Sequence, residues 1–251
     1  MKHIVILFIL LISAGNLKAQ DYTQPLQGIK KVKIHSESGV KIIVHDQNQL
    51  KILGDGHEIP EKAKGLKAVY AGGSDNTGLG MYVQKEGETL IIKNLKGMHG
   101  KLLKIYLPKS INIKVERSNM GDISLQGFTS EIEVSTNIGD ITLTNVTGPI
   151  VARTSTGEIN VVFNKVNQSS PISLMSSTGE VDVSLPSNTP ANLMLKTSMG
   201  EIYTDFDIKF PEEENNMKIV SGKRSIKTEL NNGGVEISLR SSTGNIYLRK
   251  K

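Results

Sequence analysis

Alternation of apolar and polar residues is the strongest pattern along this chain. The alternating pairs lie two positions apart and are rich in β-branched side chains: Ile123/Leu125, Ile132/Val134, Ile141/Leu143, Ile159/Val161 and Val181/Val183. A period of two in such residues predicts strands with one buried face. Before residue 108, the segments KKVKIHS, GVKIIVHD, QLKIL, ETLIIKNL and KLLKIYLP predict further strands. The chain is therefore expected to be all-β.

A short motif recurs beside these strands. It reads SNMGDISL from Ser118, TNIGDITL from Thr136, TSTGEINV from Thr154, SSTGEVDV from Ser176, TSMGEIYT from Thr197 and SSTGNIYL from Ser241. The first three motif glycines are 18 residues apart, and the segments SEIEV and GPIVA begin halfway between them, so the step is nine residues. Later spacings are 22, 21 and 44 residues, with prolines and a polar run in the gaps. The pattern indicates a repeat architecture with insertions in its loops.

A nine-residue unit that holds one strand and one corner is too short for a helix-containing repeat. Two such units, 18 to 22 residues, fit one coil of a β-solenoid in which each coil stacks on the coil before it at about 4.8 Å. In this register Ile141 points into the interior between Ile123 and Ile159, while Asp140 points to solvent. A solenoid also needs capped ends, and residues 22–28 or the last strand, ending in LRKK, are candidates.

The motif is interpreted as a corner. Glycine tolerates the positive φ of a sharp turn, and the stacked Ser, Thr and Asn residues before it are expected to bond along the solenoid axis. The acidic column is expected to be a solvated face; it comprises Asp122, Asp140, Glu158, Glu180 and Glu201. The alternative is a ladder of calcium ligands, but the Gly-Gly-x-Gly-x-Asp pattern of calcium-binding solenoids is absent.

The first residues predict export. Lys2 precedes an apolar run from Ile4 to Ile12 and then small residues up to Ala19, the layout of a signal peptide over residues 1–19. Cysteine is absent, so the exported part, a single domain over residues 20–251, has neither disulfides nor a lipidated cysteine. We expect irregular opening coils over 28–107, with an excursion from His57 to Gly80, and motif-bearing coils over 108–251.

Candidate chemistry is sparse. His35, His45 and His57 are ten and twelve residues apart, and stacking on adjacent strands would make them a weak metal-site candidate. No nucleophile elbow, zinc-protease or phosphate-loop motif is present. The net charge is +5, but aromatic residues make up only 4% of the chain, which disfavours nucleic-acid binding. We therefore assign no catalytic, cofactor-binding or metal residues and expect no cofactor.

The order of these segments resembles a known family. The run YVQKEGETLIIKNL, the strand ending at Pro108 and the units at Gly121, Gly139 and Gly157 are similar to a bacterial family of putative adhesins built from β-strand repeats, related to adhesins with a Gly-Ile-Asn head domain. The resemblance covers roughly residues 28–250 and implies a right-handed, single-stranded β-solenoid with a proposed role in adhesion. A leader ending in KAQ is similar to those of Bacteroidota and implies the periplasm or the cell surface.

The resulting hypothesis is a non-catalytic, adhesin-like scaffold or binding protein at the cell envelope, with a surface polysaccharide or an envelope protein as partner. One alternative is a polysaccharide-acting enzyme on a β-helix, by analogy of fold alone. Another is an envelope subunit that assembles end to end through the edges of the solenoid.

Overall fold

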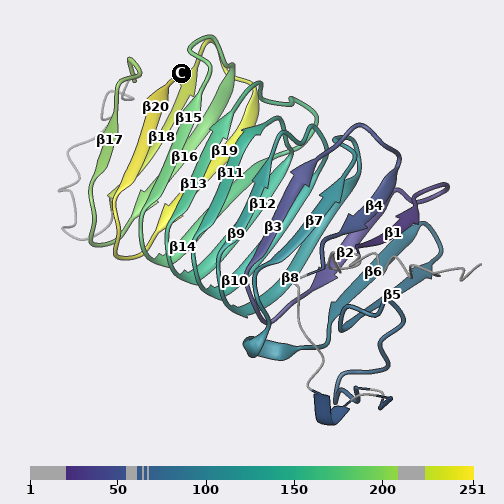
Figure 1. Ribbon diagram of the computed structural model, residues 1–251. Helices are drawn as coiled ribbons and strands as arrows, with labels where there is room; N and C mark the ends of the chain where they lie inside the picture. The colour runs from purple at the N-terminus through teal and green to yellow at the C-terminus, as the bar shows by residue number, and fades with distance from the viewer. Residues whose placement is uncertain (1–20, 55–60, 64, 67, 209–223) are drawn as a thin grey trace, which may run out of the picture.

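The computed structural model describes residues 21–54, 61–63, 65–66, 68–208 and 224–251, which form two long β-sheets around a shared core (Figure 1). Sheet A has the order β1 (Tyr22–Pro25), β4 (Gln49–Ile52), β7 (Leu103–Leu107), β3 (Val40–Val44), β9 (Ile123–Gln126), β11 (Ile141–Val146), β13 (Ile159–Phe163), β15 (Val181–Leu185), β20 (Ile246–Lys250) and β17 (Ile202–Thr204). Sheet B has the order β18 (Arg224–Leu230), β16 (Ala191–Thr197), β19 (Val235–Ser241), β14 (Ile172–Thr178), β12 (Ile150–Thr156), β10 (Ile132–Ile138), β8 (Asn112–Met120), β2 (Lys31–His35), β6 (Thr89–Asn94) and β5 (Met81–Glu86). Two short 3-10 helices, η1 (Glu61–Ala63) and η2 (Gly97–His99), lie outside the sheets.

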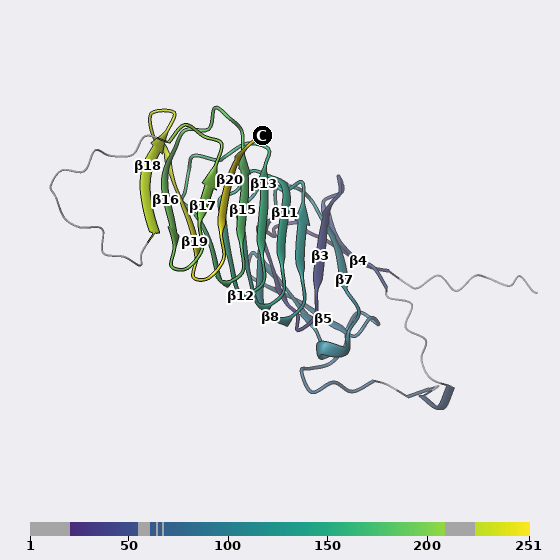
Figure 2. The same ribbon diagram turned by 90° about the vertical axis from the view of Figure 1, so that its left-hand side faces the viewer.

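The central coils confirm the β-solenoid prediction. Each coil contributes one strand to sheet B and the next strand to sheet A, and neighbouring coils pair in parallel (Figures 1 and 2). From β8 to β15 the coils stack in chain order. Ile141 is paired with Ile123 on one side and Ile159 on the other, and it is fully buried. The predicted register is therefore confirmed.

The coils at the two ends do not stack in chain order. The first coil, β2–β3, lies between the β6–β7 and β8–β9 coils. The last coil, β19–β20, lies between the β14–β15 and β16–β17 coils. The prediction that every coil stacks on the coil before it is thus wrong at both ends. Because the first and last coils are inserted, their strands are paired on both edges.

Antiparallel strands close much of each end of the stack. At the amino-terminal end β5 pairs with β6, while β4 pairs with β7 and carries β1 at the edge of sheet A. At the other end β18 pairs antiparallel with β16, and the three-residue β17 forms the edge of sheet A. The expectation that residues 22–28 cap one end agrees with β1. The last strand is not a cap, because β20 is enclosed between β15 and β17.

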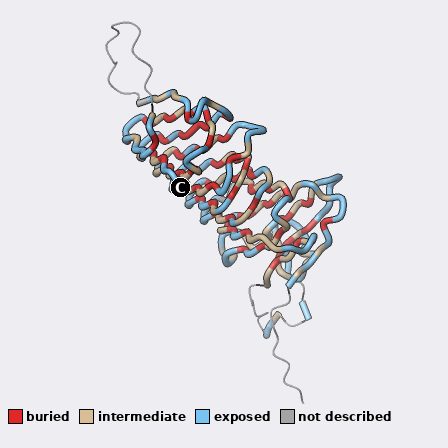
Figure 3. Tube along the Cα trace, turned by 90° about the horizontal axis from the view of Figure 1, so that it is seen from above, coloured by how far each residue is buried: buried red, intermediate tan, exposed pale blue. Residues whose placement is uncertain are grey.

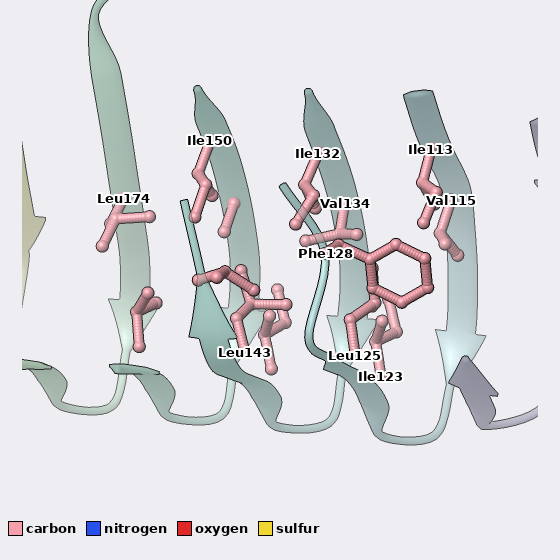
Figure 4. Packing of buried hydrophobic residues seen from close by; sticks show 14 of the residues in the cluster. Ile113, Val115, Ile123, Leu125, Phe128, Ile132, Val134, Leu143, Ile150 and Leu174 are labelled. Atoms are coloured by element: carbon pink, nitrogen blue, oxygen red, sulfur yellow. The ribbon is translucent and has the colours of Figure 1, made fainter. Parts of the chain in front are cut away.

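The core is a continuous apolar layer between the two sheets. Figure 3 shows buried positions alternating with exposed ones along the strands. In the close view of Figure 4, Ile113, Ile132 and Leu125 point into the space between the sheets, and Phe128 fills part of it. Phe128 and Phe163 are both fully buried, so these two aromatic rings are packing groups and leave the outer surface to other residues.

The chain leaves the stack between β4 and β5. In the described part of this segment a 3-10 helix and one isolated bridge, Tyr70 to Gly73, are the regular features. The described residues include no helix long and apolar enough to cross a membrane. The predicted signal peptide, residues 1–19, and His57 lie outside the described residues.

Candidate functional site

The motif glycines form one column along a corner of the solenoid. A Cβ atom would lie 2.0–2.3 Å from the carbonyl oxygen of the neighbouring coil's glycine at five of these positions: Gly139, Gly157, Gly179, Gly244 and Gly200. Real Cβ atoms do not approach a carbonyl so closely, so each glycine is needed for the contact between coils. Gly139 and Gly157 also have φ values of 144° and 143°, as a sharp turn predicts. The motif is therefore a corner, and its glycines set the distance between coils.

The hydroxyl residues three positions before each glycine stabilise the same corner. Thr154 Oγ1 donates to the Gly139 carbonyl (3.0 Å), and Ser176 Oγ donates to that of Gly157 (2.8 Å). The pattern continues in the end coils, where Ser241 donates to Gly179 and Thr197 to Gly244. These side chains are buried, so the bonds satisfy carbonyl groups that water does not reach. The predicted bonding along the solenoid axis is confirmed.

The acidic column also takes part in the corner. Asp122 Oδ1 accepts the backbone N–H of Asp140 (3.0 Å), and Asp140 Oδ1 accepts that of Glu158 (2.8 Å). Their carboxylates are exposed, as predicted, yet each one connects two coils. Over the described part of the chain no group of three or more His, Asp or Glu side chains is placed to hold a metal ion. These carboxylates therefore have a structural role, which is to connect neighbouring coils.

The histidines do not form a stack. His35 belongs to sheet B and His45 follows β3 in sheet A, so the core separates the two imidazole rings. His45 Nε2 lies 2.7 Å from the Gln49 carbonyl oxygen, while His35 Nδ1 lies 3.5 Å from a carboxylate oxygen of Glu116. The hypothesis of a metal site on adjacent strands is therefore wrong for His35 and His45.

The outer face of sheet A carries an aromatic group that the sequence did not indicate. The rings of Tyr203 on β17 and Tyr247 on β20 stack with centroids 5.4 Å apart. Glu180 accepts hydrogen bonds from Tyr247 Oη and Asn245 Nδ2, both at 3.2 Å. Arg249 packs over the Tyr247 ring. Tyr203 and Tyr247 are 44 residues apart in the sequence, and the pairing of β17 with β20 brings them together.

The outer face of sheet B divides into two halves of different electrostatics. In the amino-terminal half Glu116 lies 3.0 Å from Lys33 Nζ and 3.3 Å from Lys114 Nζ, and Lys114 also pairs with Glu133 at 2.9 Å. Partial burial alone would raise the pKa of Glu116, but the hydrogen bonds and charges of Lys33 and Lys114 outweigh it and lower this pKa. Burial lowers the pKa of His35. This half is a network of compensated charges.

The carboxy-terminal half of the same face carries a row of outward side chains, here called the basic row: Arg153, Met175, Arg240 and Lys196. No salt bridge joins its three cations to an acidic side chain of the described residues. Each member lies four positions before a motif glycine. Sequence reasoning missed the row because the four residues are scattered over nearly ninety positions, although aligning the motifs on their glycines would have revealed it.

These observations describe a regular scaffold with two broad outer faces, and comparison with known proteins assigns its family. The family model Toastrack DUF4097 matches residues 66–249 of the 251-residue chain. The chain belongs to the Toastrack DUF4097 family. The Toastrack match begins inside the excursion, so it includes the β6–β7 coil and every later coil but not β2–β3.

Two solved structures are similar to this Toastrack chain. One is described as a putative cell adhesion protein from Clostridium sporogenes ATCC 15579, with 13% identity, coverage of 93% of this chain and 100% of that chain, and a TM-score of 0.40. The other is described as a putative adhesin from Bacteroides fragilis NCTC 9343, with 12% identity, coverage of 92% and 96%, and a TM-score of 0.42. The comparison with curated proteins found no match.

Proposed function

We propose that this Toastrack protein is an exported, non-catalytic, adhesin-like scaffold that binds a partner at the cell envelope through the outer faces of its sheets. The observation that carries the proposal is the use of the repeated motif. Its glycines, its buried Ser and Thr hydroxyls, and the carboxylates of Asp122 and Asp140 all contact the neighbouring coil. The repeat thus builds a long rigid surface, and a repeated surface suits an extended partner.

Export is supported by the composition of the chain. The leader at residues 1–19 has the layout of a signal peptide, and the fold has no cysteine to oxidise outside the cytoplasm. Stability comes instead from one continuous core between the sheets. The address of the exported chain is the periplasm or the cell surface.

The proposal is tested by producing the full chain, with a carboxy-terminal tag, in a Gram-negative host. We expect the tagged protein in the periplasmic or surface fraction, with Gln20 as its first residue by mass spectrometry. The purified exported protein should sediment with isolated cell envelopes. A protein that stays in the cytoplasm with its leader attached would contradict export. A purified protein that does not sediment with envelopes would contradict the binding function.

Catalysis is tested on the same purified protein. Acidic and neutral polysaccharides are incubated with it, with and without calcium, and the products are separated by size. The scaffold proposal predicts unchanged polymer length. Turnover of any of these polymers would favour an enzyme on a β-solenoid.

A further inference from the structure

The basic row on sheet B is ordered by the strand register. Arg153 on β12 is paired with Met175 on β14, Met175 with Arg240 on β19, and Arg240 with Lys196 on β16. Neighbouring strands are about 4.8 Å apart, so the four side chains form a line parallel to the solenoid axis. Arg153 and Arg240 are exposed, Met175 is 39% exposed and Lys196 is half-buried. The line is accessible along its whole length.

A second line, here called the hydroxyl row, runs beside the basic row. It contains the residue two positions further along each strand or its end: Ser155, Ser177, Ser242 and Ser198. Ser155, Ser242 and Ser198 are exposed, and Ser177 is half-buried. Each of these four coils therefore presents one hydroxyl beside one cationic or thioether side chain.

The cations of the basic row differ from those in the other half of the same face. Lys33 and Lys114 each have a carboxylate within 3.3 Å. In the basic row, Arg240 donates to the hydroxyl of Ser238 and to the sulfur of Met194, which are neutral groups. Glu236, an acidic residue on the same strand, lies four positions away, about 13 Å along an extended chain. The positive charge of the basic row is thus left for a partner.

We propose that the basic row and the hydroxyl row together bind a linear acidic polysaccharide that lies along the solenoid axis. The guanidinium groups of Arg153 and Arg240 match a carboxylate in a bidentate manner, and serine hydroxyls both donate to and accept from sugar hydroxyls. The adjacent thioethers of Met175 and Met194 provide adaptable apolar contact. This proposal rests on the binding function above and specifies its surface and its ligand class.

The chemistry favours a sugar polymer over a nucleic acid. Proteins that bind single-stranded nucleic acids stack the bases on aromatic side chains. Neither row contains an aromatic residue, and the stacked Tyr203 and Tyr247 lie on the opposite sheet. A straight row of cations and hydroxyls instead suits a polymer that carries carboxylates at regular intervals.

The test is a titration of the purified exported protein with polygalacturonate at low and at moderate salt. The variant Arg240→Gln/Lys196→Gln removes two adjacent charges from the basic row. The control, Lys41→Gln/Lys104→Gln, removes two exposed charges that are paired in register on sheet A. We expect salt-sensitive binding by the wild type, affinity at least about tenfold weaker in the basic-row variant, and unchanged affinity in the control. Thermal melting verifies that both variants are folded.

Several outcomes would overturn the inference. These are no binding to polygalacturonate, equal losses in the two variants, an unaffected basic-row variant, or binding only to oligo(dT) or to phosphatidylglycerol vesicles. Sedimentation with cell envelopes, measured in parallel, separates the two proposals. Envelope binding without polygalacturonate binding rejects the acidic-polysaccharide surface alone, whereas loss of both rejects the binding function as well.

Discussion

The central coils and the end coils share one motif but use it in different backbone settings. Gly139 and Gly157, in the centre, combine a positive φ with a close contact to the preceding coil. Gly244 and Gly200, in the last two coils, keep the close contact, with a Cβ 2.1 Å from a carbonyl oxygen, but their φ lies outside the left-handed region. In both regions the glycine is required because the backbones of two neighbouring coils approach each other closely. Among the motif glycines, only those of the central coils, Gly121, Gly139, Gly157 and Gly179, also have a positive φ.

The same two regions differ in topology. The central coils are neighbours both in sequence and in space, whereas the first and last coils are each inserted between two coils that follow one another in the chain. Insertion encloses the coils β2–β3 and β19–β20 and leaves antiparallel or short strands at the outer edges. An exposed edge of a long parallel sheet would recruit other chains, so this arrangement protects the stack.

A buried charge gives the largest expected difference between the regions. Ile141→Asp places a carboxylate in the fully buried centre and should cost several kcal/mol, enough to unfold a marginally stable domain. Ile202→Asp, on the half-buried edge strand β17, should lower the melting temperature much less. Thermal melting by circular dichroism measures both. Equal effects at the two sites would contradict the burial difference.

A conservative change next to Ile141 is the control for that prediction. Asp140→Asn keeps the oxygen that accepts the Glu158 N–H, so stability should change by about 0.5 kcal/mol or less, with or without calcium. A calcium-dependent loss of stability in Asp140→Asn would restore the ligand-ladder hypothesis.

Substitution of the motif glycines separates close contact from turn geometry. Gly157→Ala combines a clash with a positive φ and should cost more than about 4 kcal/mol. Gly244→Ala has the same clash without the positive φ, and we expect a loss nearly as large. Gly87→Ala, with φ 59° and no atom near the added Cβ, should cost only about 1–2 kcal/mol. Chemical denaturation measures the loss of stability in the three variants. A small loss in Gly244→Ala would show that turn geometry matters more than the close contact.

The buried hydroxyls should give a smaller effect that is similar in both regions. Thr154→Val and Ser241→Ala each leave a glycine carbonyl without its buried donor, at a cost of about 1–3 kcal/mol. Ser155→Ala, at an exposed neighbouring position, is the control and should be nearly neutral. A neutral Thr154→Val in denaturation experiments would contradict the role of the hydroxyl column.

The smallest effect is expected from acid. The pKa of Glu116 is below its ordinary value of 4.5, so the unfolded chain takes up the proton first and stability falls as the pH drops through and below 4.5. The lowered pKa of His35 acts in the same direction, beginning below its ordinary value of 6.5. Glu116→Gln should therefore reduce the fall in melting temperature that accompanies acidification. The same fall in melting temperature in wild type and variant would show that the ion pairs of Glu116 do not contribute to stability.

The alternating pattern and the nine-residue step were sufficient to predict the central coils, since local periodicity fixes both the buried face and the corner. These two patterns could not predict the order in which the end coils stack. Val181 pairs with Ile246, but pairing with Ile202 would place an equally apolar β-branched residue in the same position. Which coil is inserted depends on long-range pairing, and one sequence carries no local signal for it. The basic row was missed for a different reason: its members are far apart in the sequence, and they line up only when the motifs are aligned on their glycines.

Coil order is tested most directly by engineered disulfides, because the chain contains no cysteine. Ser173, Ser238 and Met194 occupy consecutive strands of sheet B in one row. Adjacent strands place Cα atoms about 4.8 Å apart, within disulfide range, whereas strands two apart are about 9.6 Å apart and outside it. Ser173→Cys/Ser238→Cys should therefore crosslink under mild oxidation, and Ser173→Cys/Met194→Cys should not, as read by mass spectrometry of non-reduced peptides. The reverse result would mean that the coils stack in chain order and that the last coil is not inserted.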